Sequence, residues 1–158
     1  MAVHVVGLIS DTHGQVRAGV HRALAGVSLI LHAGDVGEGV LDELALIAPV
    51  RGVRGNTDAP DPRLAPNLVL TIGGVSFHVS HGHEVGSPTP AKLLAKYPEH
   101  VIVYGHTHRY HEIRDAGRLV INPGAAGPQR FDLTPSVVRL TVRDGAVETE
   151  LVKLDSGE

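Results

Sequence analysis

Side chains that can bind metal ions occur in five short segments, each directly after a run of apolar residues. The segments read Asp11-Thr12-His13, Gly34-Asp35, Gly55-Asn56-Thr57-Asp58, His81-Gly82-His83 and Gly105-His106-Thr107-His108. Taken singly, Asp11 or Asp35 could cap a helix, Asn56 could stabilise a turn, and His81 could be an ordinary hydrogen-bonded loop histidine. Helix capping gives no reason for histidine in three of the five segments, so the whole set favours metal binding.

The donor types narrow the choice of metal. Imidazole, carboxylate and amide ligands favour Mn, Fe, Co, Ni or Zn over Mg or Ca, and the chain has no cysteine to supply thiolate. Asp35 could bridge two ions through its two carboxylate oxygens. Two divalent cations about 3.5 to 4 Å apart would activate a shared water, and their remaining positive charge would attract phosphate. These ligands therefore predict hydrolysis of phosphate esters by a metal-bridging hydroxide at a dinuclear site.

Strands are expected to position the ligands. In the first half, strands are predicted at Val3 to Ile9, Ser28 to His32 and Pro49 to Arg54, with helices at Gln15 to Ala25 and Val40 to Ile47. Because ligands gather beyond the carboxyl ends of strands in α/β sheets, the first three segments should meet there.

The second half has a more antiparallel pattern. A hairpin is predicted from Asn67 to Ile72 and Val75 to Ser80, which flank Gly73-Gly74. Loops are expected at Pro60 to Pro66 and Gly82 to Pro90, and a second hairpin turn at Asp144-Gly145. The other expected elements are a helix at Pro90 to Tyr97 and strands at Val101 to Tyr104, Tyr110 to Arg114, Leu119 to Asn122, Val137 to Val142 and Val147 to Leu154.

Composition limits the class of protein. A chain of 158 residues with 42% hydrophobic residues suits a single domain, 1–158, with a frayed tail at 155–158. The net charge of -3 argues against general nucleic-acid binding. The first ten residues lack a basic region and are too few to span a membrane, so a cytoplasmic protein without membrane association is expected.

The order of the five segments resembles that of the calcineurin-like metallophosphoesterase superfamily, and the match spans most of the chain. The short length and the Asn122-Pro123-Gly124 turn resemble its small bacterial and archaeal phosphodiesterase branch. This resemblance implies an α/β fold with a two-sheet β-sandwich flanked by helices. It also implies two ligand sets that share one aspartate: Asp11, His13, Asp35 and His108 for one metal, and Asp35, Asn56, His81 and His106 for the other. Manganese is the expected metal, and small relatives often form homo-oligomers.

Several positions near the ligands qualify the resemblance. Many larger relatives carry a proton-donating histidine where this chain has Thr57, and losing a general acid costs a factor of about 10² to 10⁴. His83 is a candidate replacement, although an ordinary loop histidine is the alternative. Asp58 is expected to orient its own loop or to support a metal ligand, without contacting the substrate. Ala125 stands where relatives often have serine, which leaves the support of one ligand in question.

Three functions are compatible with this pattern. The first is a metallophosphodiesterase acting on small phosphate esters, in which Asn56 and His83 would assist catalysis. The second is a non-catalytic protein-binding scaffold, because the same fold includes a trafficking-complex subunit that uses the former active-site face for partners. The third is a nuclease, which the absence of a basic stripe disfavours. All seven ligand positions are intact, which favours the first.

Overall fold

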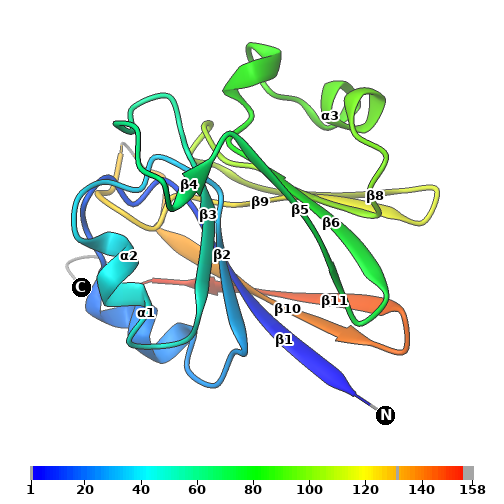
Figure 1. Ribbon diagram of the computed structural model, residues 1–158, viewed down its shortest axis with the longest axis horizontal. Coiled ribbons are helices and arrows are strands. Elements are labelled where there is room, and N and C mark those ends of the chain that lie inside the picture. Colours follow the sequence, from blue (N-terminus) through cyan, green and yellow to red (C-terminus); the bar gives the residue numbers. More distant parts are fainter. Residues whose placement is uncertain (1, 131, 155–158) are drawn as a thin grey trace.

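Two mixed β-sheets pack face to face in the computed structural model, which describes residues 2–130 and 132–154. The larger sheet has the strand order β11-β10-β1-β2-β3-β4. Its strands are β1 (Val3–Ile9), β2 (Leu29–His32), β3 (Val50–Val53), β4 (Leu64–Ala65), β10 (Ser136–Arg143) and β11 (Ala146–Lys153). The blue to cyan strands and the orange and red strands of Figure 1 form this layer.

The smaller sheet has the order β5-β6-β7-β9-β8. Its strands are β5 (Asn67–Ile72), β6 (Val75–Ser80), β7 (Val101–Val103), β8 (Tyr110–Asp115) and β9 (Arg118–Pro123). The β6–β7 and β7–β9 pairs are parallel, whereas β5–β6 and β8–β9 are antiparallel hairpins. The second half is therefore less antiparallel than the sequence suggested, and β10 and β11 return to the first sheet beside β1.

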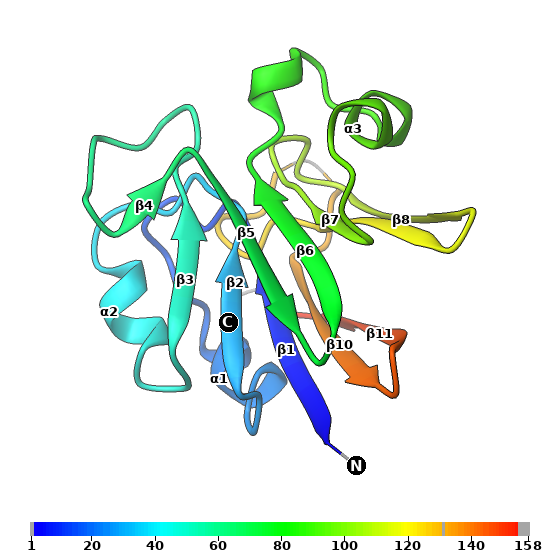
Figure 2. The same ribbon diagram turned by 45° about the vertical axis from the view of Figure 1, so that its right-hand side comes forward.

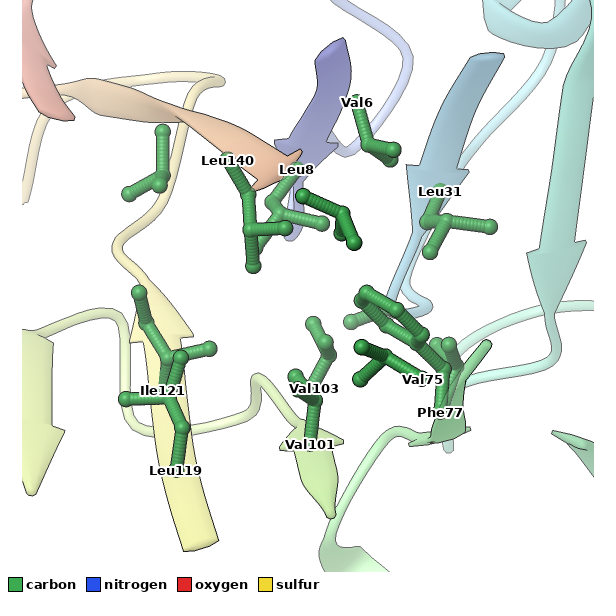
Figure 3. Packing of buried hydrophobic residues seen from close by; sticks show 14 of the residues in the cluster. Val6, Leu8, Leu31, Val75, Phe77, Val101, Val103, Leu119, Ile121 and Leu140 are labelled. Atoms are coloured by element: carbon green, nitrogen blue, oxygen red, sulfur yellow. The ribbon is translucent and has the colours of Figure 1, made fainter. Parts of the chain in front are cut away.

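The main hydrophobic core fills the space between the two sheets. Leu8, Leu31 and Leu140 of the larger sheet face Phe77 and Val103 of the smaller one, and all five are fully buried (Figure 3). Burying each such side chain stabilises the fold by roughly 1.5–3 kcal/mol. This core joins the two sheets into one rigid support.

Helices cover the outer faces of the sandwich. Helices α1 (Ala18–Ala23) and α2 (Val40–Leu44) contribute to a second hydrophobic cluster on the larger sheet, and α3 (Pro90–Lys96) packs against Ile102 and Val120 of the smaller sheet. Figures 1 and 2 show α1 and α2 on one side and α3 on the other. The predicted two-sheet β-sandwich flanked by helices is thus confirmed.

Some predicted boundaries were wrong. The helix expected from Gln15 begins at Ala18, because Arg17 has an extended backbone with ψ 147°. The helix expected to reach Ile47 ends at Leu44, where the backbone tightens and the amide of Ile47 donates to the carbonyl of Leu44.

Two short elements lie in segments that were expected to be loops. The two-residue strand β4 pairs with β3, and a 3-10 turn, η1 (His83–Val85), follows β6. The predicted frayed tail at 155–158 lies outside the described residues. No helix among the described residues is long and apolar enough to cross a membrane.

Candidate metal centre

The five ligand-bearing loops meet at one edge of the sandwich. Strands β1, β2 and β3 run parallel, as do β6 and β7, and each is followed by one of these loops. The arrowheads of β2, β3 and β6 point to the same end of the molecule in Figure 2. Both sheets therefore contribute side chains to a single site.

Asp11 lies at the middle of the cluster. Its Oδ1 atom is 3.4 Å from His108 Nε2, 4.0 Å from His13 Nε2 and 3.8 Å from His81 Nε2. This oxygen is buried and accepts no hydrogen bond from any described residue. A buried, unpaired carboxylate oxygen is costly unless a cation satisfies it, so the site fits a metal ion.

Asp35 lies beside the same imidazoles. Its Oδ2 atom is 3.2 Å from His81 Nε2 and 3.7 Å from His13 Nε2. Two groups have ligand atoms close enough to hold an ion, namely Asp11 with His13 and His108, and Asp11 with Asp35 and His81. Asp11 is common to both groups.

The other two predicted ligands lie at the rim. His106 Nδ1 is 3.3 Å from His81 Nε2, and the backbone amide of His106 donates to Asp11 Oδ2 at 3.1 Å. Asn56 is exposed on the loop after β3. Each of six predicted ligands thus has a side-chain nitrogen or oxygen within 4.0 Å of that of at least one other, and Asn56 lies on an adjoining loop.

The ligand loops have strained backbones. Among the described non-glycine residues, seven have positive φ, and five of these are predicted ligands: Asp11 (54°), His13 (46°), Asp35 (54°), His106 (76°) and His108 (65°). Each such conformation costs about 1–2 kcal/mol in an ordinary residue. Strain of this kind concentrates at functional sites, where the surrounding fold enforces it.

Glycines let the loops approach closely. A Cβ atom at Gly105 would lie 2.6 Å from Asp11 Oδ2 and would also collide with the Ser10 hydroxyl. A Cβ at Gly55 would lie 2.8 Å from Asp35 Cγ. Both glycines are therefore needed for space beside the ligands.

Asp58 holds two loops together. Its Oδ1 accepts from the amides of Val36 and Gly37 at 2.9 and 3.2 Å, and its Oδ2 accepts from Gly55 at 2.9 Å. The loop after β3 is thereby tied to the loop that carries Asp35. The support of a metal ligand by Asp58 stays a prediction.

A buried chain of hydrogen bonds stabilises the loop between Asp11 and His13. Thr12 Oγ1 donates to the carbonyl of Val36 at 2.6 Å, and His32 Nδ1 accepts from the amide of Gly34 at 3.0 Å. His32 Nε2 must then carry the proton that it donates to Thr12 Oγ1, 2.9 Å away. Desolvation lowers the pKa of His32 to about 3, so this ring stays neutral.

Ser10 and Asn122 were not identified as supporting residues from the sequence. Ser10 Oγ donates to Asp11 Oδ2 at 2.6 Å, and Asn122 Nδ2 donates to the carbonyl of Gly105 at 3.2 Å and to Thr107 Oγ1 at 3.0 Å. Two sequence signals were available. Ser10 directly precedes the predicted ligand Asp11 after a strand, and Asn122 directly precedes Pro123-Gly124 at the end of another.

The ionisable side chains among the predicted ligands have different electrostatic environments. Burial raises the pKa of Asp11. Burial also opposes ionisation of Asp35, but hydrogen bonds from His81 and from the Thr57 amide outweigh it and lower the pKa of Asp35. Desolvation lowers the pKa values of His106 and His108, whereas for His81 the nearby carboxylates outweigh desolvation and raise its pKa. Binding of a cation by these side chains would therefore release protons.

His83 and Ala125, two of the positions that qualify the resemblance, have different surroundings. The ring of His83 is exposed and lies 5.4 Å from the ring of His81 and 6.4 Å from that of His106. His108 Nδ1 is buried and has no hydrogen-bond partner among the described residues, and Ala125 lines a small pocket with His108. Because residue 125 is alanine, it supplies no hydroxyl that could form a hydrogen bond with His108 Nδ1.

Fold and site together define a helix-flanked β-sandwich with a carboxylate and imidazole centre suited to metal ions. The model of the calcineurin-like phosphoesterase superfamily domain matches residues 5–145, and the chain belongs to this family. The predicted resemblance is thereby confirmed.

Three similar proteins illustrate the family. The chain is 30% identical to a probable metallophosphoesterase of Methanothermobacter thermautotrophicus, over 94% of this chain and 92% of that protein. It is 29% identical to a phosphodiesterase of Methanocaldococcus jannaschii, over 75% of this chain and 82% of the relative. The crystal structure of wild-type Vps29 from Entamoeba histolytica complexed with zinc superposes with a TM-score of 0.75, at 25% identity, over 94% of this chain and 98% of that one.

Proposed function

We propose that this protein is a metal-dependent phosphodiesterase that hydrolyses small phosphodiesters at a dinuclear centre. The observation that carries the proposal is the buried, unpaired Asp11 Oδ1, which has three imidazole nitrogens within 4.0 Å. Membership of the phosphoesterase family and the similarity to an archaeal phosphodiesterase support the same reaction class.

The ligand assignment divides the side chains into two sets. Asp11, His13, Asp35 and His108 would hold one ion, and Asp35, Asn56, His81 and His106 the other. The position of Asp35 Oδ2, 3.7 Å from His13 and 3.2 Å from His81, supports a bridging role because these imidazoles belong to different sets. The donors suit Mn, with Ni, Fe, Co and Zn as alternatives.

Two bound divalent cations would supply an activated hydroxide and stabilise the extra negative charge at phosphorus. The chain's own residues orient the reaction: the Thr57 amide, which donates to Asp35 Oδ1 at 3.0 Å, holds this carboxylate in place. Asn56 would also contact the phosphoryl oxygens from the exposed rim. His83 is the proposed proton donor to the leaving oxygen, since its exposed ring lies beside His81 and His106.

The exposed Thr57 should determine which esters react. The threonine hydroxyl is too weakly acidic to act as a general acid near neutral pH, so His83 would be the sole proton donor and esters whose leaving groups need little protonation should be favoured. We expect aryl phosphodiesters to be hydrolysed faster than alkyl phosphomonoesters in steady-state assays. Faster turnover of an alkyl monoester than of an aryl diester would contradict this expectation.

The decisive experiment is hydrolysis of bis-p-nitrophenyl phosphate by chelator-treated protein, with and without Mn²⁺. Turnover should require the metal, and Asp35→Asn should lower it by at least about 10²-fold because the bridging charge is lost. Asp42→Asn, which neutralises an exposed carboxylate (83% exposed side chain) that pairs with Arg63, is the matched control and should retain activity.

The protein-binding scaffold is the alternative, supported by the similarity to Vps29. Absence of turnover with Mn²⁺, Ni²⁺, Co²⁺, Zn²⁺ and anaerobic Fe²⁺ would make this alternative the leading one. Preferential cleavage of oligonucleotides would instead favour the nuclease.

A further inference from the structure

A pocket of about 210 Å³ adjoins the His83 edge of the metal centre. Arg54, at the end of β3, lines one wall, and Lys96 and Tyr97, at the end of α3, line another. His83 and Glu84 of η1 also line the pocket. The pocket thus forms where the two sheets and α3 come together.

The cationic side chains of this pocket are available to a ligand. In the described part of the chain, neither the Arg54 guanidinium nor the Lys96 ammonium has an ion pair or a hydrogen bond. Lys96 Nζ lies over the Tyr97 ring, 5.7 Å from the ring centroid. Arg54 is half-buried, so its charge is less screened than at an open surface.

Glu84 does not neutralise these cations by direct pairing. Its Oε1 accepts from the Gly82 amide at 2.9 Å, and its Oε2 accepts from the Tyr97 hydroxyl at 2.7 Å. Tyr97 is in turn held by stacking on His78, with ring centroids 3.6 Å apart. The pocket therefore has a rigid wall and an excess of positive charge.

His83 links the pocket to the reaction centre, because its ring lines the pocket and lies 5.4 Å from that of His81. We propose that the pocket binds a second anionic group, a carboxylate or a phosphate, on the leaving alcohol of the phosphodiester. This inference rests on the proposed phosphodiesterase function and specifies its substrate class. Arg54 and Lys96 are then specificity residues that contact the leaving group and take no part in bond breaking.

Three aryl diesters test the position of the anionic group. The reference is phenyl 4-nitrophenyl phosphate. One analogue carries a carboxylate on the leaving arm (phenyl 3-carboxy-4-nitrophenyl phosphate), and the other carries it on the retained arm (3-carboxyphenyl 4-nitrophenyl phosphate). With Mn²⁺-loaded protein, kcat/KM for the leaving-arm carboxylate should exceed that of the reference by about tenfold, mainly through a lower KM. The retained-arm carboxylate should give no such gain.

Matched variants separate the pocket from general electrostatics. Arg54→Ala and Lys96→Ala should each remove most of the preference, so that kcat/KM for the leaving-arm carboxylate falls to near that of the reference ester, which lacks the carboxylate. Arg51→Ala and Lys92→Ala remove the same charges from β3 and α3 outside the pocket lining, and they should retain the preference. An equal loss in the control variants, or equal gains from both carboxylated esters, would overturn the proposal.

Binding gives a readout that does not depend on turnover. The leaving alcohol, 5-hydroxy-2-nitrobenzoate, should shift the amide NMR signals of Arg54 and Tyr97 in metal-free protein, and Arg54→Ala should weaken these shifts. If no ester is hydrolysed but the shifts occur, the proposed function fails while the anion pocket stands. If the reference ester is hydrolysed without any preference or shifts, the pocket proposal fails and the phosphodiesterase stands.

Discussion

At the scale of single residues, the two central carboxylates have opposite electrostatic settings. Asp11 is buried with one unpaired oxygen, and its pKa is raised by desolvation. Asp35 is equally close to the imidazoles, but hydrogen bonds from His81 and Thr57 outweigh its burial and keep it ionised. The fold thus favours the ionised form of Asp35, which is why neutralisation of Asp35 is the most informative substitution.

His32 provides a residue-scale prediction on pH dependence. Its pKa is lowered to about 3 in the folded chain from an ordinary value of 6.5, so the unfolded chain binds more protons between these pH values. Its contribution to stability is therefore fully present above pH 6.5 and decreases as the pH falls toward 3, by at most about 1.4 kcal/mol per pH unit.

Urea unfolding of chelator-treated protein between pH 5 and 7.5 measures this effect. His32→Gln removes the titrating ring, so its free energy of unfolding should depend less steeply on pH than that of the wild type. Identical slopes for the two proteins would show that the buried ring does not control the acid sensitivity.

At the scale of elements, short strands and tight loops bring the ligands together. Gly105 follows β7 in a space bounded by Ser10 and Asp11, which follow β1 of the other sheet. Gly105→Ala should lower the free energy of unfolding by about 1–3 kcal/mol through overpacking and should weaken metal binding at least tenfold. Isothermal titration with Mn²⁺ and urea unfolding measure the two effects.

Gly117→Ala is the matched control for that substitution. Gly117 has φ +82° in the β8–β9 turn, and among the described residues no atom beyond its chain neighbours lies within 4 Å of an added Cβ. Alanine there should cost about 1 kcal/mol through backbone strain alone and leave the metal affinity unchanged. Unchanged affinity in Gly105→Ala as well would indicate that the loop relaxes without moving Asp11.

At the scale of the whole molecule, the centre joins the two sheets. Asp11 follows β1 of the larger sheet, whereas His81 and His108 follow strands of the smaller one. A cation bound there would join the loop edges of the two sheets, in addition to the hydrophobic core between them.

Metal should consequently stabilise the fold. At a free Mn²⁺ concentration about 100 times Kd, the gain is about 2.7 kcal/mol, which corresponds to a rise in Tm of roughly 5–10 °C for a domain of this size. Calorimetry with Mn²⁺ or chelator measures the shift, and Asp35→Asn should lose most of it whereas Asp42→Asn should not. An equal shift in Asp35→Asn would place the bound ion elsewhere.

The sequence by itself determined the ligand inventory and the local elements. Both the Gly73-Gly74 and Asp144-Gly145 turns join antiparallel strands as expected, because short-range pairing depends on turn chemistry and alternating burial. The carboxyl ends of apolar strands likewise indicated where the segments of Asp11, Asp35 and Asn56 would gather, since that relation holds for parallel strands in general.

Only the tertiary structure decided which distant segments lie together. The pairing of β10 with β1, the contacts of Asp58 with the loop after β2, and the pocket between Arg54 and Lys96 all join residues far apart in the chain. Local propensity carries no information about such pairings, because they depend on how the two sheets pack around their shared core. For the same reason, the opposite pKa shifts of Asp11 and Asp35 follow from burial and hydrogen bonds that exist only in the folded chain.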